Sequence, residues 1–170
     1  GSSLELVDPR GDNRLPANWS GSDESAKSSW VFTSITGRLD NGNGSADEAH
    51  FTMLGEGECL IDGLAVRQPA GGANRLTNGT FEAGVGGWVI EGNHINSSWK
   101  TNEGYSSSRC LHVRASGGGD AAANRIEADL SSSLTTGSDG VLQFAARWVC
   151  GHPDVLLRLR GNWLEAVCTL

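Results

Sequence analysis

The chain has 170 residues, of which 24 are glycine, and a formal net charge of −7 at pH 7. This length suits one domain, or one domain with a tail. The negative charge argues against a nucleic-acid partner, because phosphate binding needs clustered Lys and Arg. No apolar run approaches the ~20 residues that cross a bilayer, so we expect no membrane insertion. The chain begins without a basic-then-apolar signal, and we interpret it as a piece of a longer protein.

The first 29 residues are mostly polar and rich in turn formers. A short apolar alternation at residues 4–7 precedes Pro, Gly, Asp and Asn at residues 8–13, which favour turns. Residues 20–25 read as a loop. We therefore predict an N-terminal arm over residues 1–29 and one domain over residues 30–170.

Three strands are predicted next. Residues 30–39 are β-branched and aromatic, and a strong turn signal follows them at residues 40–44. Residues 49–54 alternate between polar and apolar side chains, which predicts a second strand. After a Gly-Glu-Gly turn, residues 58–67 form a third apolar run, interrupted only by Asp62.

Residues 68–74 form a connector, and the rest of the chain again shows short apolar stretches separated by turn residues. Further strands are predicted near residues 87–91, 109–115, 124–130, 141–149, 155–160 and 163–169. No segment carries a sustained helical stripe with caps, so we expect no long helix. Many short strands separated by turns are typical of an all-β sandwich or jelly roll.

Residues 78–88 read Asn-Gly-Thr-Phe-Glu-Ala-Gly-Val-Gly-Gly-Trp. They resemble the first strand of the jelly-roll carbohydrate-binding modules attached to xylanases and cellulases, in the galactose-binding-like superfamily. Those modules begin N-G-x-F-E, with a Gly-rich loop and Gly-Trp after it. Residues 104–113, 124–130 and 134–148 keep the order of later motifs. The resemblance implies a jelly roll of two antiparallel sheets and a polysaccharide or glycan as partner.

The motifs of the closing strands come first in this chain. Residues 30–37, 49–54 and 59–64 resemble the end of such a module, yet they precede its opening motif. The chain is either a circularly permuted jelly roll or the end of one repeat followed by the start of another. We favour permutation, because domain termini often lie close together and two half-sheets would leave open edges.

The first residues suggest a context. Residues 3–9, Ser-Leu-Glu-Leu-Val-Asp-Pro, resemble a strand near the end of lamin-tail domains. Such domains occur in large bacterial surface proteins. The resemblance implies a secreted or cell-surface protein in which neighbouring domains of the same chain are partners.

The family resemblance also implies a structural calcium. In those modules the ion often joins the Glu of the opening strand to an Asp of the closing strand, and the matching positions are Glu82 and Asp62. Calcium needs six to eight oxygen ligands. The second Asp of the family is replaced by Gly63, which removes one carboxylate. In the alternative, Asp62 and Glu82 accept backbone N–H bonds in a turn.

Exposed aromatic side chains are candidates for sugar contact, because sugar rings stack on them. Trp30 and Trp88 match core positions of the family, so we expect them to pack inside. Trp99, Tyr105 and Trp163 lie next to polar loops and are the predicted ligand-binding aromatics. In the alternative, these three are half-buried scaffold.

Arginines on the late strands are further candidates. Arg158 and Arg160 share one strand face by the period of two, and they suit an anionic sugar. The alternative is that they pair with Glu165 on the next strand, as cross-strand charges commonly do.

Four cysteines leave two possibilities open: buried thiols on strands, or at least one disulfide. Their spacing matches no zinc pattern. The residues in question are Cys59, Cys110, Cys150 and Cys168.

Catalytic motifs are missing from the sequence. It has no G-x-S-x-G nucleophile elbow and no H-E-x-x-H metal pair. The histidines are scattered at positions 50, 94, 112 and 152. We therefore expect a non-catalytic carbohydrate-binding-like module, and the alternative is a structural spacer or adhesion domain without a small ligand.

Overall fold

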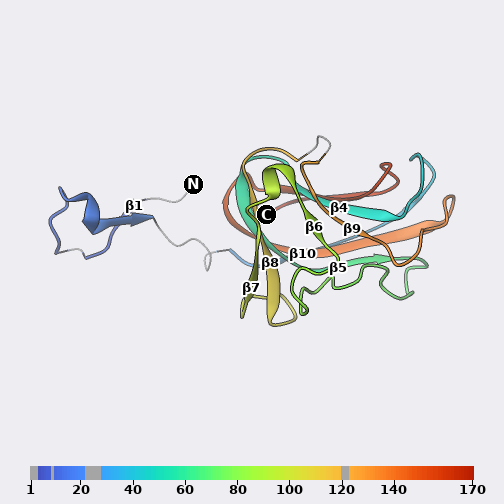
Figure 1. The fold of residues 1–170 in the computed structure, drawn as a ribbon, viewed down its shortest axis with the longest axis horizontal. Coiled ribbons are helices and arrows are strands. Elements are labelled where there is room, and N and C mark those ends of the chain that lie inside the picture. The colour runs from blue at the N-terminus through green and yellow to red at the C-terminus, as the bar shows by residue number, and fades with distance from the viewer. Residues whose placement is uncertain (1–3, 9, 22–27, 120–122) are drawn as a thin grey trace.

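Alternating apolar and polar residues make strands the main secondary structure of this chain. The computed structural model describes residues 4–8, 10–21, 28–119 and 123–170. Two antiparallel five-stranded sheets pack together as a β-sandwich, which confirms the predicted all-β class (Figure 1). Short 3-10 turns, Pro16–Asn18 and Gly92–His94, are the helical elements of the described residues. This part of the chain holds no helix that could cross a membrane.

A small hairpin precedes the sandwich. β1 (Leu4–Leu6) pairs antiparallel with β2 (Trp19–Gly21), and both strands are largely exposed. In Figure 1 this hairpin stands apart from the two sheets. The stretch that resembles a lamin-tail strand overlaps β1, although its first and last residues, 3 and 9, lie outside the described residues. The domain boundary near residue 30 stays a prediction.

The strands of the two sheets alternate along the sequence. The first sheet has the order β3 (Val31–Arg38), β10 (Asp139–Gly151), β5 (Gly57–Arg67), β8 (Arg109–Ala115), β7 (Ser98–Thr101). The second sheet has the order β12 (Glu165–Thr169), β11 (Asp154–Leu159), β4 (Glu48–Met53), β9 (Ile126–Asp129), β6 (Val89–Ile90).

The early and late parts of the chain are interleaved within both sheets. β5 lies between β10 and β8, and β4 lies between β11 and β9. β4 and β5, which come before residue 68, are thus flanked on both sides by strands that come after residue 88, and β3 pairs with β10 at the edge of the first sheet. Neither part has a complete sheet of its own, so the two parts form one sandwich.

The core lies between the sheets and draws on both parts. Phe51 of β4 meets Phe144 of β10 edge to face, with ring centroids 5.8 Å apart, and both side chains are fully buried. Phe81 and Trp88 pack together at 5.3 Å, which confirms the core position expected for Trp88. Burial of such aromatic pairs is the main favourable term that holds the sheets together.

The first and last residues of the sandwich, Ser28 and Leu170, both lie near the turn between β10 and β11. The hydroxyl of Ser28 donates to the carbonyl of Trp148 at the end of β10. The amide of Leu170 donates to the carbonyl of Pro153, just before β11 (3.1 Å). The chain therefore enters and leaves the sandwich at the same end.

All four cysteines are free thiols on strands. Cys59 and Cys110 are buried in β5 and β8, and Cys150 and Cys168 are half-buried in β10 and β12. Free thiols on strands agree with the first alternative, but its expectation that the thiols are buried is met by Cys59 and Cys110 only.

Candidate functional site

Three aromatic side chains meet on the outer face of the first sheet. Phe32 points outward from β3 and is 51% exposed, and Tyr105, which is 43% exposed, comes from the loop between β7 and β8. Their rings are nearly parallel (11°), with centroids 6.2 Å apart. The half-buried ring of Trp30 lies 5.8 Å from that of Tyr105. We call these three residues the aromatic cluster.

Asp62 of β5 holds the Tyr105 loop onto the sheet. Its carboxylate is fully buried, and Oδ2 accepts from the amide of Tyr105 (2.8 Å) and the hydroxyl of Ser107 (3.2 Å). Oδ1 accepts from the amide of Gly63 (2.6 Å), whose φ of 64° belongs to a bulge against β10. Burial raises the pKa of Asp62, although these hydrogen bonds oppose the shift.

Glu82 holds the other end of the same loop. It accepts a hydrogen bond from the hydroxyl of Ser108 (3.1 Å) and lies 3.7 Å from Nε of Arg109. The Arg109 guanidinium in turn covers the ring of Trp99 at 4.5 Å. Trp99 also donates from its indole nitrogen to the carbonyl of Phe81 (2.8 Å), so its ring is fixed against the opening loop.

The surroundings of Asp62 and Glu82 are those of carboxylates that hold a loop. Their partners are N–H and O–H donors and an arginine, whereas calcium needs further oxygen ligands. Asp62 and Glu82 therefore accept hydrogen bonds from the loop, as expected in the alternative without a calcium ion. Calcium at these two residues stays a prediction.

Polar groups flank the aromatic cluster. The Arg147 guanidinium lies 5.6 Å from the ring centroid of Trp30, and its Nη2 donates to Glu103 (3.2 Å). Arg147 is paired across the sheet with Leu60, and Leu60 with His112, so all three share the outer face. Charged and apolar groups therefore alternate along one row of this face.

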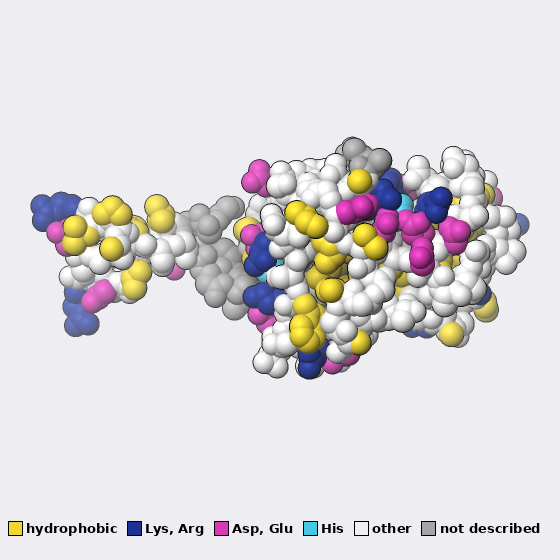
Figure 2. Space-filling view, viewed as in Figure 1, with side chains coloured by type: hydrophobic (Ala, Val, Ile, Leu, Met, Phe, Trp, Pro, Cys, Tyr) yellow, Lys and Arg dark blue, Asp and Glu magenta, His cyan; other side chains and the backbone are white. Residues whose placement is uncertain are grey.

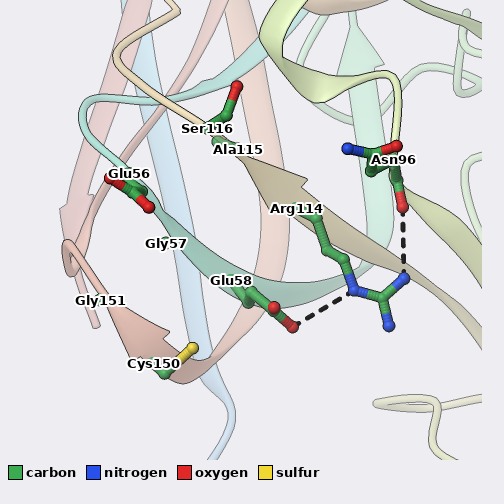
Figure 3. Close-up of a pocket in the computed structure, with 9 residues that line it drawn as sticks. All are labelled: Glu56, Gly57, Glu58, Asn96, Arg114, Ala115, Ser116, Cys150 and Gly151. Carbon is green, nitrogen blue, oxygen red and sulfur yellow. Dashed lines mark hydrogen bonds and ion pairs between the residues drawn. The ribbon is translucent and has the colours of Figure 1, made fainter.

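A pocket lies at the end of the same face, between β5, β8 and β10 (Figure 3). Its volume is about 430 Å³. Glu58 on its wall lies 2.7 Å from Nε2 of His112 and accepts from Nε of Arg114 (3.4 Å). Burial, and secondarily the charge of Arg114, lowers the pKa of His112. The pocket thus offers a carboxylate and a guanidinium that are already oriented.

The predicted ligand residues are divided between two regions. Trp99 lies on β7, the edge strand of the first sheet, and Tyr105 lies in the loop after it. Trp163 packs against the core from the turn after β11, and a Cβ at Gly42 would lie 2.4 Å from its ring. Arg158 is paired with Glu165 across β11 and β12, the register expected in the cross-strand alternative. Arg160 binds Glu48 (3.0 Å).

Trp30 and Phe32 were not among the predicted ligand residues. Trp30 was expected in the core, and this was wrong, because the described core contains Trp88 and not Trp30. The sequence does carry a usable signal. Trp30 and Phe32 have the same parity as Ser34 and Thr36, so they belong to the polar face of that strand.

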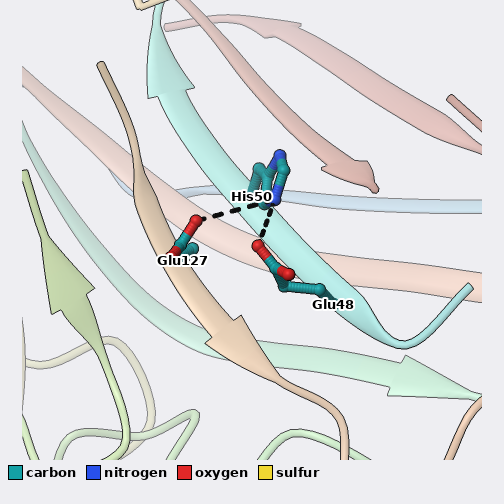
Figure 4. Close-up of side chains that lie close together, drawn as sticks. All are labelled: Glu48, His50 and Glu127. Atoms are coloured by element: carbon teal, nitrogen blue, oxygen red, sulfur yellow. Dashed lines mark hydrogen bonds and ion pairs between the residues drawn. The ribbon is translucent and has the colours of Figure 1, made fainter. Parts of the chain in front are cut away.

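A second cluster lies on the outer face of the second sheet. Nε2 of His50 lies 2.6 Å from Glu48 Oε1 and 3.8 Å from Glu127 Oε2 (Figure 4). All three side chains are at least four-fifths buried, and they could hold a metal ion. Burial lowers the pKa of His50. Burial raises the pKa of Glu127, which Arg125 opposes and Glu48 reinforces.

His94 is fully buried at one edge of the sandwich, where its Nε2 accepts from the amide of Met53 (3.1 Å). Burial lowers the pKa of His94 to about 4. In the unfolded chain this pKa is near 6.5, so unfolding takes up a proton at acid pH. Stability from neutral His94 is present above pH 6.5 and is lost as the pH falls toward 4.

We expect His94→Gln, which keeps an acceptor for the Met53 amide, to lose less stability than the wild type as the pH falls. Urea unfolding midpoints at pH 7 and pH 4.5 would measure it. The half-exposed His152→Gln serves as the control. If the urea midpoint of His94→Gln falls between pH 7 and pH 4.5 as much as that of the wild type, another group causes the acid sensitivity.

Comparisons with protein-family models, with curated proteins and with solved structures found no significant match. Function has to be inferred from the geometry of the chain's own residues.

Proposed function

We propose that this chain is a non-catalytic carbohydrate-binding module, and that the ligand lies on the outer face of the first sheet. The observation that carries the proposal is the aromatic cluster. Two exposed and nearly parallel rings, Phe32 and Tyr105, offer apolar surface on a polar face. The C–H faces of sugar rings stack on such surfaces.

The polar neighbours supply the second requirement of a sugar site. A ligand stacked on the cluster comes close to Arg147 and Glu103, which are joined by a hydrogen bond of 3.2 Å. Paired charged groups are oriented in advance and can exchange hydrogen bonds with hydroxyls at small entropic cost. Further along the sheet, Glu58 and Arg114 offer a similar pair in the pocket.

The interleaved strands support the resemblance to the jelly-roll carbohydrate-binding modules. A permuted module needs its old termini joined and its new ends at one place. Here residues 68–88 join β5 to β6, Ser28 bonds Trp148 in the last part of β10, and Leu170 bonds Pro153 between β10 and β11. On this proposal the protein is secreted or at the cell surface, where polysaccharides are found.

Retention on polysaccharides tests the proposal. Affinity gels with xylan, β-glucan, cellulose and polygalacturonate should retard the wild-type protein on at least one of them. We expect Tyr105→Ala and Phe32→Ala each to weaken that binding about tenfold, which is 1.4 kcal/mol for one lost ring contact. Trp19→Ala, which removes an exposed ring of the hairpin, is the matched control.

Two outcomes would oppose the proposal. If no polysaccharide retards the wild-type protein, the spacer without a small ligand is the better description. If Trp19→Ala weakens binding as much as Tyr105→Ala, the ligand does not lie on the first sheet.

A further inference from the structure

The cluster of Glu48, His50 and Glu127 is built by strand register. His50 of β4 stands directly opposite Glu127 of β9, and Glu48 is two residues from His50 on the same strand. The period of two places all three side chains on the outer face of the second sheet. This face is opposite the one that carries the aromatic cluster. The backbone therefore brings one imidazole and two carboxylates to a single point.

The spacing of the ligand atoms suits a small divalent ion. Bonds of about 2.0–2.2 Å to a tetrahedral ion place ligand atoms about 3.3–3.6 Å apart. Nε2 of His50 is now 2.6 Å from one carboxylate oxygen and 3.8 Å from the other, and all ligand atoms lie within 4.8 Å. Adjustments of about 1 Å, within the reach of side-chain rotation, would complete the geometry.

Arginines hold the two carboxylates in place from outside the cluster. Arg160 donates to Oε2 of Glu48 (3.0 Å), which leaves Oε1 facing His50. Arg125 bonds Glu127 in the same manner. Hydrogen bonds of this kind orient ligands at metal sites, and their loss weakens metal binding.

The charge around the cluster favours a cation. Arg125 also pairs with Glu91 (3.6 Å) and Arg160 with Asp47 (3.9 Å). The remaining guanidinium, Arg158, stands in the register between His50 of β4 and Glu165 of β12. Carboxylates therefore outnumber guanidiniums on this face, and Figure 2 shows acidic side chains gathered over β4 and β9. A divalent cation would offset that excess.

We propose that Glu48, His50 and Glu127 bind one first-row divalent transition ion of the zinc type. Nε2 of His50 and one oxygen of each carboxylate are the ligands, and the ion joins β4 to β9. An imidazole with two carboxylates suits zinc or cobalt. Calcium and magnesium require more oxygen ligands than the cluster offers. The site is independent of sugar binding on the first sheet.

Cobalt and zinc titrations of tag-free protein test this proposal. We expect one Co²⁺ per chain with visible absorption bands, displacement by Zn²⁺, and a rise in Tm with Zn²⁺. Glu127→Gln keeps the shape of the side chain and should weaken Co²⁺ binding at least about tenfold. Asp139→Asn, which removes an exposed carboxylate from the other sheet, is the control and should bind as the wild type does. A Ca²⁺ titration should leave the cobalt spectrum unchanged.

Other results would overturn the site. They are the absence of Co²⁺ and Zn²⁺ binding to folded wild-type protein, and equal binding by Glu127→Gln and the wild type. A thiolate charge-transfer band would assign the ion to the half-buried Cys150 or Cys168 instead. His50→Gln provides a second test should Glu127→Gln fail to fold.

Discussion

Phe144→Ala is expected to lower the free energy of unfolding by about 3–5 kcal/mol, the usual cost of removing a buried phenylalanine ring. Phe144 is fully buried, and its ring packs edge to face on that of Phe51. One ring comes from the late part of the chain and the other from the early part. The cavity would therefore weaken the contact between the two sheets. Urea unfolding followed by tryptophan fluorescence measures the loss.

Phe32→Ala is the matched control for this prediction, because it removes the same ring from an exposed position. We expect it to cost less than about 1.5 kcal/mol. Should Phe144→Ala leave too little stability to measure, Phe144→Leu keeps most of the volume and should cost about 1–2 kcal/mol. Equal losses in Phe144→Ala and Phe32→Ala would mean that Phe144 is not in a shared core.

Asp62→Ala is expected to lower the free energy of unfolding by about 3 kcal/mol. The buried carboxylate accepts from the amides of Gly63 and Tyr105 and from the hydroxyl of Ser107. Alanine would leave these donors without their partner, at about 1–3 kcal/mol for each one that stays buried. The same urea experiment measures this loss.

The exposed Asp139→Ala, on β10 of the same sheet, is the control and should change stability by less than about 0.5 kcal/mol. The Asp62 variant should also release the Tyr105 loop from the sheet. Faster amide hydrogen exchange over residues 103–108 would report that release. Unchanged exchange there would show that Asp62 does not hold the loop.

The sequence was most informative about strands. The alternation at residues 30–39 and the apolar runs at residues 58–67 and 141–149 predict β3, β5 and β10 because those strands are long and their patterns regular. β7 was missed, since Ser98–Thr101 is short and mixes Trp with Ser, Lys and Thr. Turn residues between the strands supplied most of the boundaries.

The pairing between strands that are distant in the sequence was harder to predict. The reversed motif order suggested that the two parts close over one core, and the place of β5 between β10 and β8 agrees with it. The alternation of strands between two sheets cannot be read from local patterns, because register depends on contacts across the core.

The candidate sites, too, depend partly on local sequence patterns and partly on tertiary contacts. Parity along β3 puts Phe32 on the polar face, but Tyr105 reaches it only because Asp62 folds a loop over the sheet. His50 and Glu127 are 77 positions apart and meet through the register of β4 and β9. Such meetings depend on tertiary structure and have no local signature in the sequence.

The indole N–H signals of the six tryptophans offer the most direct test of ligand binding on the first sheet. The folded protein would be titrated with xylan, β-glucan and galacturonan oligosaccharides and followed by two-dimensional NMR. We expect the indole signal of Trp30, which lies against Tyr105, to shift, while that of Trp163, which packs against the core from the turn after β11, stays in place. Shifts confined to Trp163, or no shift with any of these sugars, would contradict carbohydrate binding by the aromatic cluster.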